Sequence, residues 1–450
     1  MFLRSIPWLN SRKRTLIAYF FEVFSFIIIY LFIYKLRFSE LPAYSIYQIF
    51  LLHFWILISY VFGRYSGEIY VKKNLVIYIA KTLLVLIFSI SFFLTFIWAF
   101  GAQNVSFIFR SFLVPFLFTY ALISIFVQIF IAFLVKVKSK DRNKFCFVGS
   151  KRVWEQLKAE KNISKIDLDI IFIGSIEEIL DFDLSLFSGL VIEDINILNN
   201  NYYTFRKLQD NDFLILNIFE WCEIYLQRFP TNLITFSNLI SNKFKAKKTS
   251  IYLRVKRVSD LFVSVFLILI SSPIVFLSCV LIKAEDGGPI LYKQIRNGYG
   301  ERKFNIYKLR TMLENSEISG PQWSQNNDRR ITNIGRIMRV TRIDELPQLF
   351  SVLSGKMSLI GPRPERPEFD VKLEKEINFY KKRYDFKPGL SGWAQVNYPY
   401  GASIEDSANK LSYDLFYVKN ASIWLDLLIF FKTIKLIFNA KGSRPLQNRD

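Results

Sequence analysis

The sequence predicts a membrane protein of mixed α and α/β class, and two observations carry that prediction. Long apolar runs fill the first third of the 450 residues, and a compact soluble domain could not bury them all. Beyond these runs, short apolar segments alternate with polar, helix-like stretches, a pattern typical of β–α units. We therefore expect a four-helix membrane domain at residues 1–138, an α/β domain at residues 139–249 and a mainly α domain at residues 250–450.

The overall charge of the chain narrows the classes of partner. The 59 lysines and arginines exceed the 38 aspartates and glutamates, for a formal net charge of +21. In a chain that begins in lipid, this excess favours an anionic membrane surface and phosphate-bearing ligands over nucleic acid.

The three cysteines are scattered, which argues against a disulfide framework or a zinc site. The single histidine, His53, lies in an apolar run, so histidine chemistry is nearly excluded, and we expect His53 to bond to a neighbouring helix.

Four apolar segments are long enough to cross a bilayer, which takes about 20 helical residues. They lie near residues 16–34, 44–62, 76–100 and 112–135. Basic residues precede the first segment and follow the fourth, so the positive-inside rule places both ends of this domain in the cytoplasm. No small-residue cleavage site follows the first segment, and we expect an uncleaved anchor rather than a signal peptide.

Residues 139–218 predict a Rossmann-like α/β domain with a parallel sheet. The short apolar runs KFCFVG, DIIFIG, GLVIED and DFLILNI alternate with polar stretches such as KRVWEQLKAEK, as in successive β–α units. The first turn, FVGSKRVW, holds one glycine where a dinucleotide fold needs G-x-G-x-x-G. We therefore assign no cofactor to this domain and expect a non-binding or regulatory role.

The apolar run at residues 261–282 predicts a re-entrant helix at residues 258–283. Ser271, Ser272 and Pro273 interrupt the run at its centre. A proline removes a helix hydrogen bond and bends the axis, while serine hydroxyls can satisfy the freed carbonyls. Basic residues flank the run on both sides, which places both flanks in the cytoplasm. The alternative is a kinked helix that spans the membrane and puts everything after residue 283 outside the cell.

The stretch TRIDELPQLF places two carboxylates side by side, Asp344 and Glu345, among arginines and just before Pro347. Proline is tolerated in the first turn of a helix, so one interpretation makes the pair the polar cap of a helix. The other is a reactive site, because nearby positive charge and a helix dipole keep a carboxylate ionised at neutral pH. An ionised aspartate can attack phosphorus, and an adjacent glutamate can hold Mg²⁺ or transfer a proton.

Arg363 stands between two prolines in the segment GPRP. The rigid, extended backbone presets its guanidinium, which then loses little entropy when it binds a phosphate or a base edge. For any one of the other cations in this basic part of the chain, a solvated surface position is the plainer interpretation.

Several sequence blocks follow one another in the last part of the chain. They are KRVSD, GGPILYKQIRNG, KFNIYKLRTM, DRRITNIGR, DELPQLFSVLSGKMSLIGPRP, KPGLSGWAQVN, DLFYVKN and WLDLLIFFKT. With these blocks, residues 251–437 resemble the bacterial sugar transferase domain of the polyprenyl-phosphate glycosyl-1-phosphate transferases, the monotopic phosphoglycosyl transferases that begin exopolysaccharide and O-antigen assembly. The preceding four apolar segments and the Rossmann-like domain resemble the long form of that family, so the likeness covers essentially the whole chain.

The resemblance implies a two-step reaction at the cytoplasmic face of the bacterial inner membrane. Asp344 would attack the β-phosphate of a UDP-sugar, release UMP and carry the phosphosugar, which undecaprenyl phosphate or another polyprenyl phosphate then accepts. Glu345 would assist Asp344 with Mg²⁺ or with proton transfer, and Arg363 would contact the nucleotide or its phosphates. The pair Ser272 and Pro273 would mark the break in the re-entrant helix. Further donor-binding candidates in the family blocks are Gln294, Arg296, Lys308 and Arg310.

Two positions depart from the family pattern, and two rival interpretations stay open. The family often has Asn where Ser351 stands and an acidic residue where Lys356 stands, which we interpret as subfamily variation. One rival is a membrane-anchored nucleotide-sugar dehydratase or epimerase, which would need a full glycine-rich turn. The other is a non-catalytic scaffold of a polysaccharide assembly, in which Asp344 only caps a helix. The sequence does not identify the transferred sugar. It also leaves the oligomeric state open, and a homo-oligomer is one possibility.

Overall fold

The structure is a computed structural model that describes most of the chain. The described residues are 13–40, 46–65, 72–100, 110–139, 144–164, 168–183, 186–194, 201, 203, 206–208, 213–234, 250–314, 316, 328–398 and 403–438. Contacts between residues divide the chain into two compact units, residues 1–144 with 185–188 and residues 145–184 with 189–450. The predicted α/β and C-terminal domains therefore share one unit, and the boundary between them stays a prediction.

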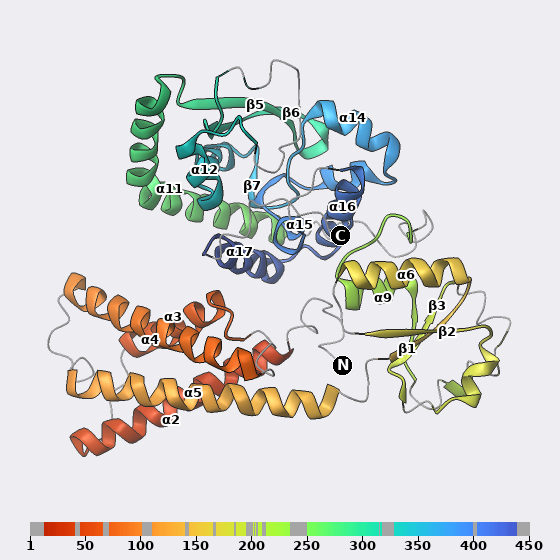
Figure 1. The fold of residues 1–450 in the computed structure, drawn as a ribbon, viewed down its shortest axis with the longest axis horizontal. Coiled ribbons are helices and arrows are strands. Elements are labelled where there is room, and N and C mark those ends of the chain that lie inside the picture. The colour runs from red at the N-terminus through yellow and green to blue at the C-terminus, as the bar shows by residue number, and fades with distance from the viewer. Residues whose placement is uncertain are drawn as a thin grey trace. The chain divides into compact units, whose positions relative to one another are not determined.

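The first unit contains four helices between residues 13 and 139, as the apolar segments predict. They are α2 (Lys13–Phe38), α3 (Ile46–Val61), α4 (Lys72–Phe100) and α5 (Arg110–Ser139), shown in Figure 1. The segments Thr15–Phe38, Val76–Thr95 and Phe112–Ile131 are long and apolar enough to cross a membrane. The apolar part of α3, Gln48–Val61, is shorter, so its crossing stays a prediction. These helices identify the chain as a membrane protein.

Polar side chains inside this unit bond across its helices. Glu22 of α2 is fully buried and accepts a hydrogen bond from Ser124 of α5 at 2.5 Å. Arg64, which follows α3, is also fully buried and donates to the same Ser124 at 2.7 Å. Such bonds stabilise charged groups that would otherwise be costly in an apolar interior. Nδ1 of His53 lies 2.8 Å from the carbonyl oxygen of Ile49 in its own helix, and among the described residues this contact replaces the predicted bond to a neighbouring helix.

The α/β domain has a parallel sheet, which confirms the coarser prediction for this part of the chain. Its strands are β1 (Lys144–Val148), β2 (Asp169–Ile173), β3 (Gly189–Ile192) and β4 (Ile215–Asn217), in the order β2-β1-β3-β4. β3 pairs in parallel with both β1 and β4. The other elements described here are α6 (Lys151–Ile163), η4 (Glu177–Asp181), α9 (Ile218–Trp221) and η6 (Cys222–Leu226). The Rossmann-like identity of the domain stays a prediction.

The turn between β1 and α6 is filled by the domain's own side chains. Ser150 caps α6 by accepting a hydrogen bond from the backbone N–H of Val153, and its own N–H donates to the carboxylate of Glu193. An added Cβ on Gly149 would lie 2.6 Å from the Cβ of Glu193, so the turn is tightly packed. In dinucleotide-binding folds the phosphates bind at this helix N-terminus, beyond the carboxyl ends of the strands. Here a carboxylate holds that position.

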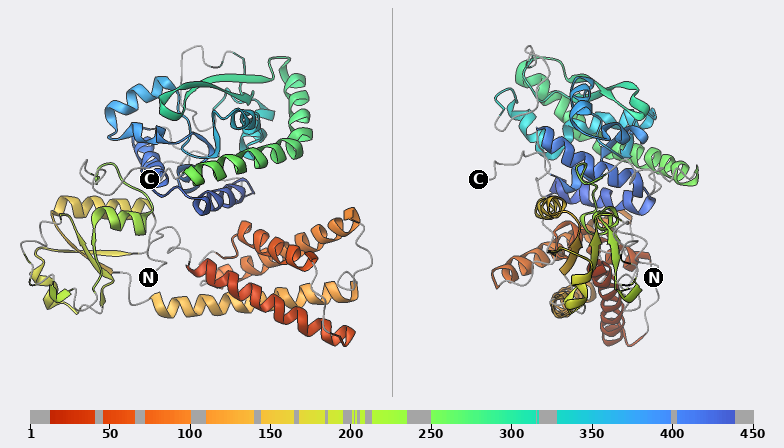
Figure 2. Two further views of the ribbon diagram at one scale, coloured as in Figure 1. Left: turned by 180° about the vertical axis from the view of Figure 1, so that it is seen from behind. Right: turned by 90° about the vertical axis from the view of Figure 1, so that its right-hand side faces the viewer.

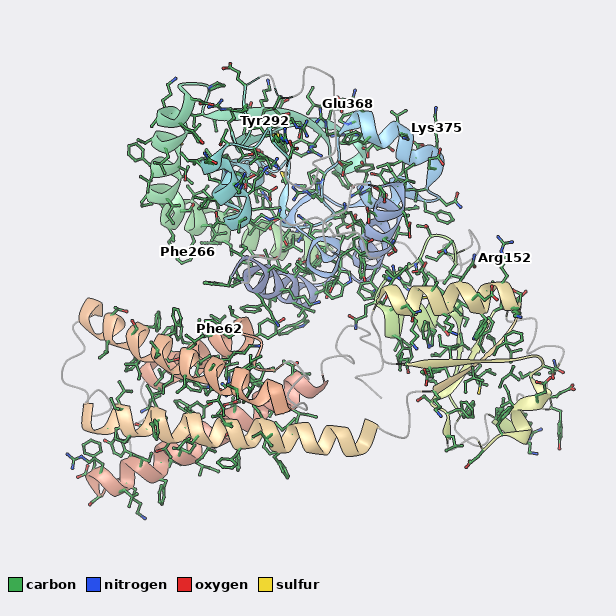
Figure 3. All side chains as sticks on the ribbon, in the orientation of Figure 1. Phe62, Arg152, Phe266, Tyr292, Glu368 and Lys375 are labelled. Carbon is green, nitrogen blue, oxygen red and sulfur yellow. The ribbon has the colours of Figure 1, made fainter. Side chains whose placement is uncertain are left out.

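α11 (Ser250–Asp286) is one continuous helix that contains Pro273 and bends along its length, as Figures 1 and 2 show. Proline lacks the N–H that would bond to the carbonyl of Leu269, and the hydroxyl of Ser272 donates to that carbonyl at 2.9 Å instead. The serine hydroxyl therefore acts as the sequence predicts. Phe266, labelled in Figure 3, is 61% exposed, like many apolar side chains of this helix. The bend fits a re-entrant helix, whose topology in the membrane stays a prediction.

Two small sheets and several short helices complete the C-terminal domain. β5 (Leu291–Asn297) and β6 (Lys303–Leu309) form an antiparallel hairpin, and β7 (Ser358–Ile360) pairs in parallel with β8 (Gly389–Ser391). The helices after α11 are η7 (Tyr299–Glu301), α12 (Asn333–Thr341), η8 (Ile343–Gln348), α13 (Leu349–Leu353), α14 (Pro367–Glu376), η9 (Tyr380–Asp385), α15 (Trp393–Asn397), α16 (Ile404–Asn420) and α17 (Ile423–Phe438). A buried cluster of Ile282, Leu309 and Met338 joins the end of α11 to β6 and α12.

Buried polar contacts hold the α/β domain against α16. Arg228 is fully buried, pairs with Glu160 of α6 and donates to the side chain of Asn409 on α16 at 2.8 Å. The backbone N–H of Phe229 donates to the carbonyl of Ser412 at 2.8 Å. One face of α16 is therefore fixed by both side-chain and backbone bonds.

Candidate active site

The short 3-10 helix η8 carries Asp344 and Glu345 into the interior of the C-terminal domain. α12 ends at Thr341, and Arg342 adopts the left-handed conformation, with a φ of 62°, before η8 begins at Ile343. A residue other than glycine in this region is costly, so surrounding contacts must hold the turn. Both carboxylates lie in the first turn of η8, and each residue is 6% exposed. Their predicted position at a helix N-terminus is confirmed.

Asp344 does not cap this helix. Among the described residues its Oδ1 is buried without a hydrogen-bond partner, and η8 has no side-chain cap. Burial, followed by the neighbouring carboxylate of Glu345, raises the pKa of Asp344 to about 6. The predicted ionisation of this carboxylate at neutral pH agrees with that value, although its pKa lies above the ordinary value of 3.8 rather than below it. Asp344 is mostly ionised at neutral pH, but against a raised pKa, because the cations bond to Glu345 instead.

Glu345 binds three cationic side chains. Its Oε1 lies 2.9 Å from Nζ of Lys308 and 2.6 Å from Nη2 of Arg363, and its Oε2 lies 3.2 Å from Nη1 of Arg342. Burial alone would raise the pKa of Glu345, but the cations, Arg363 foremost, hold it well below its usual range. The two adjacent carboxylates thus differ: Oδ1 of Asp344 has no partner among the residues described, whereas Glu345 is ionised and both of its oxygens are bonded. Such a division is typical of paired carboxylates with separate chemical roles.

The segment GPRP brings Arg363 to Glu345 and is fixed by close backbone packing. An added Cβ on Gly361 would come within 2.4 Å of the carbonyl oxygen of Lys387, just before β8. The N–H of Gly361 donates to the carbonyl of Ser391 at 2.8 Å. The side chain of Arg363 is still 31% exposed while it bonds to Glu345. Its guanidinium can therefore contact a ligand from the open side.

Gln294 and Arg296 form a second group on β5, next to GPRP. Nη2 and Nε of Arg296 donate to the side-chain oxygen of Gln294 at 2.6 and 3.0 Å. Nη1 of Arg296 lies 3.2 Å from both the carbonyl oxygen of Pro364 and Oε1 of Glu365. After burial, the charges of Arg363 and Arg296 lower the pKa of Lys308. The structure therefore brings four of the predicted donor-binding residues together: Gln294, Arg296, Lys308 and Arg363.

The remaining predicted site residues make other contacts. Arg310, after β6, pairs with Asp286 at the end of α11 and packs against Gly288. Two of its guanidinium nitrogens are buried without a hydrogen-bond partner in the described part of the chain. Ser272 and Pro273 lie inside α11. In the structure these two residues affect the shape of that helix.

Asp344 and Glu345 fit a divalent cation only in part. The described ranges contain no group of three or more metal-ligating side chains. Oδ1 of Asp344 is available as an oxygen ligand, and Mg²⁺ is commonly held by one or two carboxylates together with substrate phosphates. Both oxygens of Glu345 already bond to cations. The predicted role of Glu345 as a metal ligand therefore does not fit this arrangement.

Two further residues belong to the site, although the sequence analysis assigns no role to either of them. The sequence analysis treats Arg342 only as one of many basic residues. It lies three residues before Glu345, however, and this spacing is typical of an ion pair on one helical turn. That signal was available. Glu365 pairs with Arg296 of β5. Burial alone would raise the pKa of Glu365, but nearby positive charges, Arg296 foremost, lower it. No local spacing predicts this second contact.

The C-terminal domain is similar to known proteins. The family described as bacterial sugar transferase matches residues 251–440. A relative from Aeromonas hydrophila, named UDP-N-acetylgalactosamine-undecaprenyl-phosphate N-acetylgalactosaminephosphotransferase, is 48% identical over 194 residues, which are 43% of this chain and 46% of the relative. A relative from Komagataeibacter xylinus, named undecaprenyl-phosphate glucose phosphotransferase, is 41% identical over 186 residues, which are 40% of this chain and 35% of the relative.

A third relative comes from Caulobacter vibrioides and is named UDP-glucose:undecaprenyl-phosphate glucose-1-phosphate transferase. It is 39% identical over 190 residues, which are 42% of this chain and 71% of the relative. The chain thus spans less than half the length of the first two relatives and more than two thirds of the third. The matched range contains Asp344, Glu345 and the three cations bonded to Glu345. The chain belongs to the bacterial sugar transferase family.

Proposed function

We propose that this protein transfers a sugar-1-phosphate from a UDP-sugar to polyprenyl phosphate, in bacteria undecaprenyl phosphate, and releases UMP. The observation that carries the proposal is a contrast between adjacent carboxylates: a buried oxygen of Asp344 has no hydrogen-bond partner among the described residues, whereas Glu345 beside it binds three cations. The names of the relatives support the acceptor and the phosphotransfer. The reaction would be the first membrane step of exopolysaccharide, O-antigen or capsule assembly, on the cytoplasmic face of the bacterial inner membrane.

In the first step, an oxygen of ionised Asp344 attacks the β-phosphorus of the donor. The bond from that phosphorus to the bridging oxygen breaks, UMP leaves with the electron pair, and the sugar-1-phosphate stays on Asp344 as an acyl phosphate. The cations held by Glu345 stabilise the negative charge that develops on the leaving phosphate. Because Glu345 binds them before the donor arrives, they need little rearrangement during the reaction.

In the second step, an oxygen of polyprenyl phosphate attacks the same phosphorus and breaks its bond to Asp344. The carboxylate is regenerated, and the product is a polyprenyl-diphosphate sugar. The apolar surface of α11 supports a lipid acceptor, because Phe262, Phe266 and Leu269 are 75%, 61% and 68% exposed. The basic residues on both flanks of this helix favour a re-entrant course, with both flanks on the cytoplasmic side where nucleotide sugars occur.

Magnesium belongs to the proposal as an ion that Asp344 and the donor phosphates would hold, where it would neutralise phosphate charge. Glu345 serves instead as the anchor of the cationic side chains.

For the sugar, N-acetylgalactosamine is the first donor to test, because the relative named for it is 48% identical, against 41% and 39% for the relatives named for glucose. The rival dehydratase or epimerase needs a dinucleotide site, and the carboxylate of Glu193 holds the position where its phosphates would bind.

The test uses membranes that contain the full chain, undecaprenyl phosphate, and either UDP-N-acetylgalactosamine or UDP-glucose with a radiolabelled sugar. We expect UMP and a labelled lipid from one donor, and labelled protein when the acceptor is left out. Asp344→Asn should abolish both products. The control is Asp385→Asn, which changes a surface carboxylate whose side chain is 40% exposed. The proposal is wrong if neither donor yields a labelled lipid, or if Asp344→Asn turns over as fast as the control.

A further inference from the structure

An arginine and an aspartate form a buried ion pair behind the GPRP segment. Arg383 is 6% exposed and Asp414 is 1% exposed, and Nη2 of Arg383 lies 3.0 Å from Oδ2 of Asp414. The same Nη2 donates to the backbone carbonyl of Arg363 at 2.9 Å. The pair therefore contacts the main chain of the residue whose guanidinium bonds to Glu345.

The backbone of GPRP can be fixed mainly through its carbonyl oxygens. Proline has no N–H to donate, so two of the three residues in Pro362–Pro364 offer only an acceptor. Each of the three carbonyls accepts a bond: Pro362 from the N–H of Gly389 at 2.8 Å, Arg363 from Arg383 at 2.9 Å, and Pro364 from Arg296 at 3.2 Å. The bond from Arg383 is the one that holds the carbonyl of Arg363 itself.

The guanidinium of Arg383 is held in place from several sides. Its Nη1 donates to the hydroxyl of Tyr380 at 2.6 Å, and that hydroxyl donates to the carboxylate of Asp370 at 2.9 Å. The guanidinium carbon lies 5.1 and 6.0 Å from the ring centres of Tyr380 and Tyr384. A buried arginine bonded and stacked in this way has one orientation, so its bond to the GPRP carbonyl has a fixed direction.

Asp414 is in turn held by the helix that carries it. It lies on α16, and the bond from Arg228 to Asn409 ties that helix to the α/β domain at 2.8 Å. A second bond joins the N–H of Phe229 to the carbonyl of Ser412 at 2.8 Å. The support for Arg383 thus comes from a rigid element rather than from a loop.

We propose that Arg383, held by Asp414, positions Arg363 for its contacts with Glu345 and with the donor diphosphate. This inference rests on the proposed function. Arg383 and Asp414 act only through Arg363 and are positioning residues. A small displacement of a positioned arginine can lower the rate of phosphoryl transfer by roughly 100-fold, so the loss of this support should be visible in the kinetics.

The test is a double-mutant cycle on the full chain in membranes. Arg383→Lys keeps the charge but loses the forked geometry, and we expect it to raise the KM for the UDP-sugar and to lower kcat/KM by roughly 10- to 100-fold. In the Arg363→Ala background the same substitution should change kcat/KM by less than about 3-fold, because the residue through which it acts is gone. Asp414→Asn should behave like Arg383→Lys in both backgrounds.

The matched control is Asp426→Asn, which breaks a partly buried ion pair of 2.8 Å with Lys256 between α17 and α11. We expect this control to lower the Tm without changing the KM for the donor. If Arg383→Lys lowers kcat/KM by the same factor with and without Arg363, its role is structural and the inference is wrong. If Arg383→Lys does not fold, Asp414→Asn decides between the same two outcomes. If the wild-type protein turns over no UDP-sugar, the proposed function fails, and the inference fails with it.

Discussion

Replacement of Asp344 by asparagine should abolish turnover and yet raise the thermal stability of the protein at neutral pH. The ionised carboxylate is costly in the folded state, because it is buried, lies next to ionised Glu345 and has no hydrogen-bond partner for Oδ1 in the described part of the chain. Asparagine has nearly the same shape and no charge, so the folded state no longer bears that cost. Functional residues are often placed at such an expense of stability.

The size of the effect follows from the pKa of Asp344, which is raised from 3.8 to about 6. The folded state holds this proton more tightly than the unfolded state, so ionisation of Asp344 destabilises the fold increasingly as the pH rises from 3.8 to about 6. At about 1.4 kcal/mol for each pH unit, the cost is about 3 kcal/mol at neutral pH and roughly half of that near pH 5.

Differential scanning fluorimetry of the full chain in detergent measures this difference. For a domain of roughly 200 residues, a gain of about 3 kcal/mol raises the Tm by several degrees. We expect that rise for Asp344→Asn at neutral pH and a smaller rise near pH 5. Glu345→Gln should have the opposite sign at neutral pH, because the lowered pKa of Glu345 means that its charge stabilises the fold there. A Tm that falls for both substitutions at neutral pH would refute this reasoning.

Three other predictions follow from the charges of the molecule. Turnover should rise with pH as Asp344 ionises, with an acid limb near its pKa of about 6, and a kcat that stays constant between about pH 5 and 8 would contradict that role. Arg228→Met should destabilise the protein by about 3–5 kcal/mol in chemical unfolding, because Glu160 stays buried without its cation. Glu22→Leu should lower the Tm of the full chain in detergent, because Ser124 loses a buried acceptor, whereas an unchanged Tm would mean that water replaces it.

The parts of the structure that the sequence predicts well depend on local constraints. Apolar runs must become helices in lipid, since each backbone group needs a partner within the segment. The same rule anticipates that Ser272 satisfies the carbonyl of Leu269 left free by Pro273. Each of these features is explained by residues within one short segment of the chain.

The electrostatics of the site depend on distant residues and could not be predicted in the same way. Lys308 comes from β6 and Arg363 from the segment after β7, yet both bond to Oε1 of Glu345. Arg310 lies only two residues after Lys308 and pairs with Asp286 of α11 instead. Sequence spacing identifies such residues as candidates. It does not reveal which carboxylate receives the cations, and for this reason the raised pKa of Asp344 is not predictable from the sequence.

The adjacency of Asp344 and Glu345 in the sequence contributes to the difference between their surroundings. Successive residues of a 3-10 helix point about 120° apart, so two neighbours in η8 can meet different surroundings although one turn carries both. A spacing of three residues would place both carboxylates on one side, where they would compete for the same cations. Instead Glu345 pairs with Lys308, Arg342 and Arg363, while one oxygen of Asp344 has no partner within the ranges that the structure describes. The positive charge stays next to Asp344 without being bonded to it, which leaves this carboxylate free to attack a phosphorus whose oxygens those cations can bind.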